Sequence, residues 1–359
     1  MSELLPFLKE LISAPGLSGY ESPVRKLIED AWRSLTDELH VSRLGSLHGL
    51  RRGVASEPRP SLLLAAHMDA VGLMVTSLVD GFLRLVEVGG LDPRVLPGQL
   101  VTVHGRRDLP GVIVQPPSHL LPPDVRNVAV PLKYLLVDVG LLPRQVERLV
   151  RVGDLVSFAQ TPLEMGGDIL AGHTLDNRAA VTAVTQCLKE LQGRLLNWDL
   201  WVVATTQEEE TFGGATTSAY QLHPTMAVAI DVTFADSPGS PAHKTFPLGK
   251  GLTLGWGPNV HPGLHQAFKD LADRLEIPYK LEAIPRHSGT DAFTMQVSAE
   301  GIPTMVIGIP LRYMHTPVEV VSLKDIARAG RLLSEFTTQL DEKFVEKRLI
   351  IPTEVRHED

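Results

Sequence analysis

The stretch SLLLAAHMD, residues 61–69, is a continuous apolar run that ends in a histidine and an aspartate. A run without alternating polar residues is typical of a strand that is buried on both faces. Side chains two positions apart in a strand point to the same side, so His67 and Asp69 are expected to lie together. A single pair of this kind commonly has only a structural role, and its meaning depends on what the rest of the chain places beside it.

Helix and strand patterns on both sides of this strand predict an α/β domain. Residues 1–35 carry two helical repeats of apolar residues, and helices alternate with strands again from about residue 166. Residues 71–165 instead offer short strand-like pieces separated by glycine and proline. We therefore predict one α/β domain from residues 1–70 and 166–359, with a small β-rich domain inserted at 71–165.

The composition argues against several classes of function. A formal net charge of −8 over 359 residues disfavours nucleic acid or an anionic membrane surface as the main partner. The single Cys187 rules out an intramolecular disulfide and fits a reducing compartment. The first residues read as a charged amphipathic helix, and no stretch approaches the ~18 uncharged apolar residues of a membrane span. We expect a cytoplasmic protein with no nucleic-acid or membrane partner.

Ionisable side chains follow each of the predicted buried strands. The carboxyl ends of parallel strands meet at one edge of an open α/β sheet, which is where such sheets bind their ligands. We therefore expect these side chains to gather there. They are His67 and Asp69, the run Glu208–Glu209–Glu210, Asp231, and His315, together with Asp176 just before a predicted helix.

Clustered acids beside two histidines are typical of a metal site. Isolated carboxylates at this edge would repel one another and resist burial, whereas divalent cations would neutralise them. The mixed ligand set favours zinc or cobalt, with manganese as a further candidate, and suffices for two metal ions ~3.5–4 Å apart. His67 is then a ligand, Asp69 the carboxylate that orients it, and a spare acid the general base. The alternative is that each acid has an ordinary role, with Asp176 as a helix N-cap and the Glu208–Glu210 run facing solvent.

The sequence resembles the dinuclear metallo-aminopeptidases that include bacterial glutamyl aminopeptidases and the tetrahedral (TET) aminopeptidases of archaea. The resemblance runs through nearly the whole chain in matching order and spacing. Its motifs are APGLSGYE, AAHMDAVG, GGLDPRVLPGQLVTVHG, LLVDVG, RVGDLVSF, TLDNRAA, TTQEE, DVTFADSPG, GTDAF and RYMHTPVEVVSLKDI.

The resemblance implies a role for each residue of the cluster. His67 and Asp231 would bind one metal, Glu209 and His315 the other, and Asp176 would bridge the two. Glu208 would be the general base, and Asp69 would support His67 from behind.

The resemblance also implies an architecture and an assembly. The fold would be a mixed sheet flanked by helices, as in zinc peptidases, with the insert as a β-barrel-like dimerisation domain. Family members often assemble from dimers into tetrahedral dodecamers that act on short peptides.

Three departures from the family pattern concern residues beside the site. Glu210 and Thr211 stand in QEEETFGGA where an apolar residue and a glycine are common, and Glu210 either raises the pKa of Glu208 or points into solvent. Asn177 replaces a frequent aspartate after Asp176, and Arg286, His287 and Ser288 precede GTDAF where smaller residues are usual. Two other functions stay open: a metal-dependent deacylase or carboxypeptidase-type hydrolase of related fold, and a shell-forming homologue whose catalysis has decayed.

Overall fold

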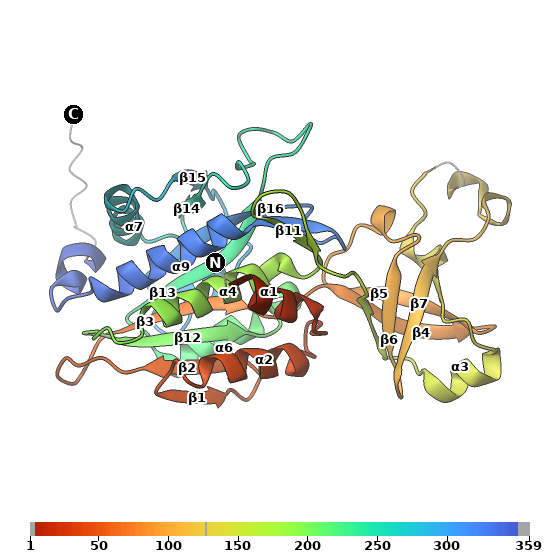
Figure 1. The fold of residues 1–359 in the computed structure, drawn as a ribbon, viewed down its shortest axis with the longest axis horizontal. Helices are drawn as coiled ribbons and strands as arrows, with labels where there is room; N and C mark the ends of the chain where they lie inside the picture. Colours follow the sequence, from red (N-terminus) through yellow and green to blue (C-terminus); the bar gives the residue numbers. More distant parts are fainter. Residues whose placement is uncertain (1–3, 126–127, 351–359) are drawn as a thin grey trace.

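The computed structural model describes residues 4–125 and 128–350 and contains a large α/β unit with a smaller barrel at one end (Figure 1). The α/β unit is built on a mixed sheet, which confirms the predicted fold class. Strands β3, β12, β13 and β16 run parallel at its centre, and the outer strands pair antiparallel except for β15, which is parallel to β14. In spatial order the strands are β1 (Glu38–Val41), β2 (Leu47–Arg51), β12 (Asp199–Thr205), β3 (Ser61–His67), β13 (Met226–Phe234), β16 (Thr304–Arg312), β17 (Glu319–Ser322), β11 (Ile169–Gly172) and β10 (Leu163–Glu164), with β14 (Leu252–Trp256) on β16 and β15 (Tyr279–Ala283) on β14.

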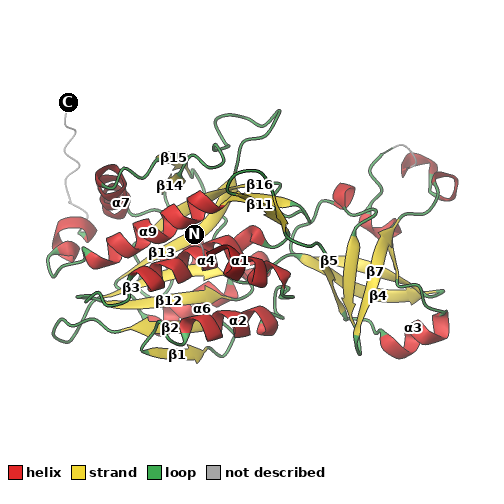
Figure 2. Ribbon diagram, viewed as in Figure 1, coloured by secondary structure: helices red, strands yellow, loops and turns green. Residues whose placement is uncertain are grey.

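Helices cover both faces of this sheet (Figure 2). On one face, α4 (Leu175–Glu190) packs against β3 and β13 and is itself covered by α1 (Leu4–Ser13) and α9 (Leu323–Thr338). Because α4 is enclosed on nearly all sides, most of its residues are buried, including polar ones such as Asn177 and Arg178. The remaining helices are α2 (Ser22–Trp32) and α7 (Pro262–Arg274), with α6 (Gly213–Leu222) and α8 (Ala292–Gln296) packed together, and α5 (Glu208–Thr211) after β12.

Six short strands of the inserted segment close into a barrel with its own apolar core. In order around the barrel they are β4 (Gly72–Val79), β5 (Phe82–Val88), β8 (Leu136–Asp138), β7 (Asp108–Val114), β6 (Leu100–His104) and β9 (Leu155–Phe158). Closure leaves these strands without a free edge. The division at residues 71 and 165 stays a prediction, as does a role of the barrel in dimerisation. Short helical segments complete the chain at Pro93–Val95, Ser118–Leu120, Pro123–Val125, Leu132–Tyr134, Pro143–Leu149 (α3) and Val345–Leu349.

The register of the central strands gathers their polar ends. His67 is the last residue of β3 and lies opposite Thr205, the last residue of β12. The pairing of β13 with β3 begins at Met226 and Leu62, and the same offset sets Asp231 level with His67. Asp231 is inside β13, whose pairing with β16 continues as far as Phe234. The ionisable residues of the central strands therefore lie at one edge of the sheet. Among residues 4–125 and 128–350, none of the helices has the length and apolarity that a membrane crossing requires.

Candidate metal centre

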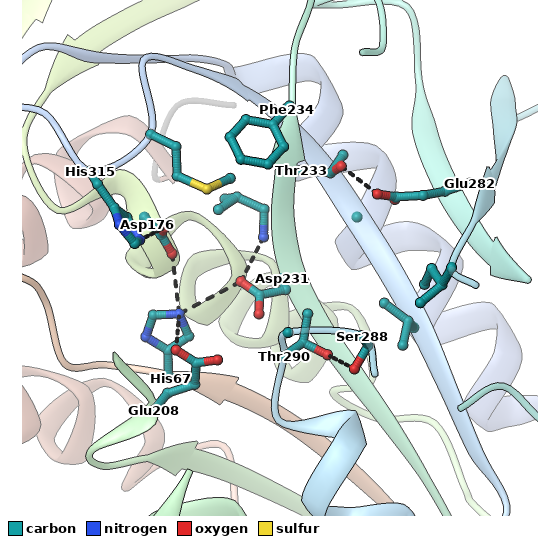
Figure 3. Close-up of a pocket in the computed structure, with 16 residues that line it drawn as sticks. His67, Asp176, Glu208, Asp231, Thr233, Phe234, Glu282, Ser288, Thr290 and His315 are labelled. Carbon is teal, nitrogen blue, oxygen red and sulfur yellow. Dashed lines mark hydrogen bonds and ion pairs between the residues drawn. The ribbon is translucent and has the colours of Figure 1, made fainter. Parts of the chain in front are cut away.

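Side chains from five separate segments meet at the carboxyl edge of the central strands (Figure 3). They come from the end of β3, the start of α4, the turn from β12 into α5, the middle of β13 and the loop between β16 and β17. Most are buried, and His315 is the most exposed, with 36% of its side chain accessible. They are His67, Asp176, Glu208, Glu209, Asp231 and His315.

Asp176 lies between the two histidines. Its Oδ1 atom is 3.2 Å from His67 Nε2, and its Oδ2 atom is 3.4 Å from His315 Nε2. Backbone angles at Asp176 are not helical, although it falls within the bounds of α4, and this lets its carboxylate face the cluster. Its carboxylate oxygens face the two histidines, so Asp176 does not serve simply as the helix N-cap considered above.

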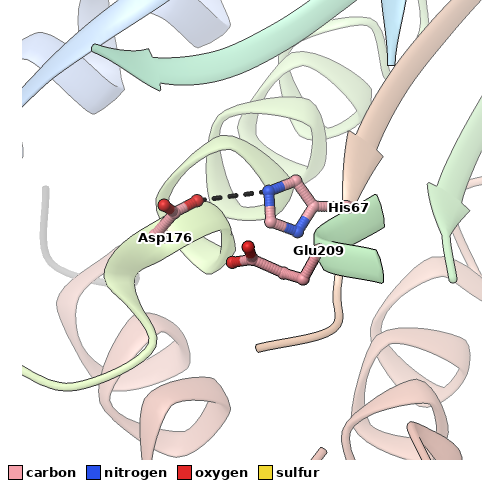
Figure 4. Close-up of side chains that lie close together, drawn as sticks. All are labelled: His67, Asp176 and Glu209. Atoms are coloured by element: carbon pink, nitrogen blue, oxygen red, sulfur yellow. Dashed lines mark ion pairs between the residues drawn. The ribbon is translucent and has the colours of Figure 1, made fainter. Parts of the chain in front are cut away.

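The other acids divide between the two histidines. Glu209 Oε2 is 3.3 Å from His315 Nε2, while Asp231 Oδ1 and Glu208 Oε2 are 3.6 and 3.8 Å from His67 Nε2. Two overlapping groups of potential ligand atoms result, one of His67, Asp176 and Glu209 (Figure 4) and one of His67, Glu208 and Asp231. The two groups share His67, and each of them could hold a metal ion.

Three of the four carboxylates of this cluster bind protons more tightly than free carboxylates do. Asp176 is the exception, because hydrogen bonds from His315 and His67 lower its pKa against the effect of burial. Burial raises the pKa of Glu208 to about 10, and the Asp231 charge adds to this effect against the opposing influence of His67. Burial and the charge of Asp176 raise the pKa of Glu209 to about 7. Burial likewise raises the pKa of Asp231. Burial and the neighbouring negative charges favour the neutral forms of Glu208, Glu209 and Asp231.

The histidines respond in the opposite direction. Burial alone would lower the pKa of His315, but hydrogen bonds with Asp176 and Glu209 raise it to about 11. For His67, the effect of burial is outweighed by the charge of Glu208 and by hydrogen bonds with its acidic neighbours, so its pKa also rises well above the usual value. The cluster thus holds protons that must leave when divalent cations bind.

The donor set fits divalent cations. Two imidazoles and four carboxylates, most of them buried, match the ligand types of zinc, cobalt and manganese. Glu209 Oε1 is buried and has no hydrogen-bond partner among the described residues. A buried carboxylate oxygen without a donor is costly, and a cation beside it would satisfy it.

Asp69 supports the cluster mainly through the backbone. Its Oδ1 and Oδ2 atoms accept hydrogen bonds from the backbone N–H groups of Glu208 and Glu209, at 3.0 and 3.1 Å. The Nδ1 atom of His67 lies closer to the carbonyl oxygen of Asp69, at 3.2 Å, than to its carboxylate, at 3.6 Å. Asp69 therefore orients three members of the cluster, and not only His67 as the sequence pattern suggested.

Glu319 is a buried residue that sequence reasoning missed. Its carboxylate accepts the backbone N–H groups of Asp176, at 3.1 Å, and of His315, at 2.9 Å. It thereby ties together two segments that are far apart in the chain. The available signal was an acid four residues after His315 in an otherwise apolar strand, a pattern that requires a buried partner.

Two further acids complete the support. Glu21 accepts the N–H groups of Gly19 and Gln207, at 2.7 and 3.1 Å, so the GLSGYE motif holds the turn before α5. Asp291, in the GTDAF motif, is buried beside the cluster and accepts a hydrogen bond from Thr205. These motifs were visible in the sequence, but their targets depend on contacts between distant segments.

The residues that depart from the family pattern lie around the cluster. Glu210 points toward the barrel and accepts the backbone N–H of Gly89 at 2.5 Å. Asn177 is buried and donates to the carbonyl oxygen of Ile230 at 2.9 Å, and Thr211 donates to the carbonyl oxygen of Gln207. Arg286 and His287 are exposed, while Ser288 hydrogen-bonds Thr290 at the rim of the pocket.

The cluster opens into a pocket of about 280 Å³. His67, Asp176, Glu208 and His315 line one side of the pocket. The walls are largely apolar, and a carboxylate from β15 faces the pocket from the opposite side (Figure 3). The remaining lining residues include Val232, Thr233, Phe234, Glu282, Ile284, Val306, Gly308 and Met314.

Comparisons with known proteins agree on one family. A family model described as M42 glutamyl aminopeptidase matches residues 45–332. A lysyl aminopeptidase of Pyrococcus furiosus is 34% identical over 93% of this chain and 96% of its own length. The crystal structure of a TET aminopeptidase from a marine sediment thaumarchaeote superposes with a TM-score of 0.91 at 30% identity, covering 96% and 98% of the two chains. The TET1 peptidase of Pyrococcus horikoshii, described as assembling into a tetrahedron or a large octahedral shell, superposes with a TM-score of 0.82 at 27% identity, covering 94% and 100%.

Proposed function

This chain belongs to the M42 glutamyl aminopeptidase family, and from that premise we propose that it is a metal-dependent aminopeptidase that removes N-terminal residues from short peptides. The observation that carries the proposal is the position of Asp176, whose two carboxylate oxygens face different histidines. A single bridging carboxylate between two ligand groups is the arrangement that two-metal hydrolases use.

The residues divide into two ligand sets around this bridge. His67 and Asp231 would hold one cation, Glu209 and His315 the other, and Asp176 both. Zinc and cobalt fit the mixed nitrogen and oxygen donors best, and manganese is a further candidate. When bound, two divalent cations polarise the scissile carbonyl and lower the pKa of water.

Glu208 is the acid left over for proton transfer. It lines the pocket, is buried, and has its Oε2 atom 3.8 Å from His67 Nε2. Without metal its raised pKa keeps it protonated near neutral pH, so its carboxylate would become available as a base once cations had displaced the proton. In the proposed reaction Glu208 takes a proton from the attacking water and passes it to the leaving amine.

Asp69 and Glu319 keep the reacting groups in position. Asp69 fixes the backbone from which Glu208 and Glu209 project, and Glu319 fixes the backbone of Asp176 and His315. Reacting groups held in place before substrate arrives lower the entropic part of the barrier.

We test the function with initial rates on a panel of aminoacyl-p-nitroanilides. Metal-stripped protein is reloaded with zinc, cobalt or manganese, and Glu208→Gln and N-acetylated substrates serve as controls. We expect metal-dependent release from free-amine substrates, absent with blocked ones and reduced at least ~100-fold in the variant. Hydrolysis of N-acetylated substrates alone would point to a deacylase. Removal of C-terminal residues alone would point to a carboxypeptidase. Bound metals without any release would point to a protein whose catalysis has decayed.

We also propose that the chain forms homo-oligomers, with dimers formed through the barrel assembling into a tetrahedral dodecamer. The TET relatives that superpose over nearly the whole chain support this proposal. Light scattering coupled to size-exclusion chromatography measures the mass directly. A mass close to that of twelve chains is expected, and a monomer at micromolar concentration would contradict it.

A further inference from the structure

The pocket contains a carboxylate that the proposed chemistry does not use. Glu282 projects from β15 and lies on the opposite side of the pocket from His67 and His315 (Figure 3). It belongs neither to the ligand groups around Asp176 nor to the acids that support their backbones. An acid set into an otherwise apolar wall requires a partner or a function.

Two threonines hold the Glu282 carboxylate in place. Thr233 donates to its Oε1 atom at 2.7 Å, and Thr253 donates to its Oε2 atom. Thr233 lies two residues after Asp231 in β13, so both side chains project from the same face of the sheet. The carboxylate is therefore fixed relative to the metal centre, which is a requirement for selecting a ligand by charge.

Gly308 leaves room for this carboxylate and its threonine partners. It lies between Asp231 on one neighbouring strand and Thr253 on the other. A Cβ atom at this position would be 3.1 Å from Glu282 Oε2 and 2.9 Å from Thr233 Cγ2, and would collide with the Thr253 hydroxyl. The missing side chain at Gly308 therefore lets the Glu282 carboxylate and its two threonine partners pack over β16. Gly308, Glu282 and His67 line the same pocket.

Carboxylates outnumber imidazoles among the ionisable side chains that line the pocket. Among the described residues that line it, there is no lysine or arginine, and burial raises the pKa of Glu282. A cation beside the carboxylate would compensate for the cost of burying its charge. Both threonine hydroxyls donate to it, which leaves the carboxylate free to accept from a further donor.

We propose that Glu282 selects peptides whose N-terminal residue is lysine or arginine, by pairing with the side-chain cation of that residue. This inference rests on the proposed aminopeptidase function, which places the substrate α-amine and scissile carbonyl at the metal centre. The apolar walls, including Ile284, Val306 and Met314, contact the methylene chain of such a residue, and Glu282 meets its cationic end. An N-terminal glutamate would instead set a second carboxylate against Glu282.

The test compares two ligands that differ in a single ammonium group. L-Lysinol and L-norleucinol carry the same four-carbon chain and free amine, and neither has a bond that a peptidase cleaves. Their affinities are measured by isothermal titration calorimetry on the metal-loaded protein, on Glu282→Gln and on Glu300→Gln, which removes an exposed charge elsewhere. Leucine p-nitroanilide hydrolysis is measured on the same three proteins as an independent report of aminopeptidase activity.

We expect lysinol to bind wild-type protein and Glu300→Gln about 30-fold more tightly than norleucinol, as a buried charge pair of ~2 kcal/mol predicts. In Glu282→Gln the difference shrinks to about threefold or less, while leucine p-nitroanilide hydrolysis by Glu300→Gln stays within about threefold of wild type. Equal binding of the two ligands by wild type, or an unchanged preference in Glu282→Gln, would overturn the inference even if leucine p-nitroanilide is cleaved. Absence of hydrolysis with an intact lysinol preference would instead overturn the proposed reaction and support the role of Glu282.

Discussion

Asp69 Oδ1 accepts the backbone N–H of Glu208 at 3.0 Å, so the residue that follows β3 by two positions fixes the start of α5. A hydrogen bond to a carboxylate is stronger than one between neutral groups. The two ends of neighbouring parallel strands are thereby locked together at the point where the proposed general base projects.

Asp69→Asn replaces one of the two accepting oxygens with a donor amide, leaving a backbone N–H of α5 without its acceptor. We expect kcat to fall about 100-fold, because an unsatisfied buried donor costs ~1–3 kcal/mol and displaces Glu208. Metal content by mass spectrometry should stay close to wild type. Ser46→Ala is the matched control, because the Ser46 hydroxyl accepts the backbone N–H of Thr206, two residues before Glu208, at 3.3 Å. This variant should change kcat less than about threefold. Equal losses in both variants would contradict the special role of Asp69.

Asp176→Asn tests the bridging position. Because Asp176 faces both histidines, we expect this variant to bind both metals more weakly. After dialysis it should retain less than about one metal ion per chain. His315→Gln touches only one side of the bridge and should retain about one. Inductively coupled plasma mass spectrometry measures both contents. Asp176→Asn protein with wild-type content would exclude a bridge.

Metal binding should release protons. At pH 7.5 the metal-free cluster keeps Glu208 and His315 protonated, because their pKa values of about 10 and about 11 lie above that pH, and both must lose the proton to act as base and ligand. Metal affinity therefore falls as the pH is lowered. We expect about two or more protons released per chain, read from the slope of the calorimetric enthalpy against buffer ionisation enthalpy. A slope of zero would contradict the predicted protonation.

Glu210→Gln tests the contact between the α/β unit and the barrel. The variant weakens a charge-assisted hydrogen bond to the Gly89 N–H, so we expect that amide to exchange with deuterium about tenfold faster. The pH profile of kcat/KM should not move, because Glu210 points toward the barrel. A shifted profile with unchanged exchange at Gly89 would instead support the alternative that Glu210 tunes Glu208.

The central part of the fold was predictable because strands buried on both faces have continuous apolar sequences. Strands such as β3 and β16 are enclosed on both faces, so their apolar runs are continuous, and α4 is enclosed in the same way. The β1–β2 hairpin and the β14–β15 pair were not predicted. Strands such as β1 and β15 are half exposed and short, and their sequences carry no clear alternation.

Predicting the site from sequence depended on the topology of parallel strands. Placing polar residues at strand ends was sufficient to bring His67 and Asp231 to one edge, since neighbouring parallel strands share that edge. The roles of Glu319 and Glu282 could not be predicted in this way. Glu319 acts on backbone groups of other segments, and Glu282 lies on an outer strand whose place in the sheet is set by tertiary packing.

The dispersal of the cluster along the chain has a consequence for biosynthesis. Its members lie at positions 67, 176, 208, 209, 231 and 315, and the last of them precedes α9 by only a few residues. A nascent chain folding from its amino end cannot assemble the site until almost all of the sheet is complete. The proposed peptidase therefore has no assembled metal centre until the segment that carries His315 has folded onto the sheet.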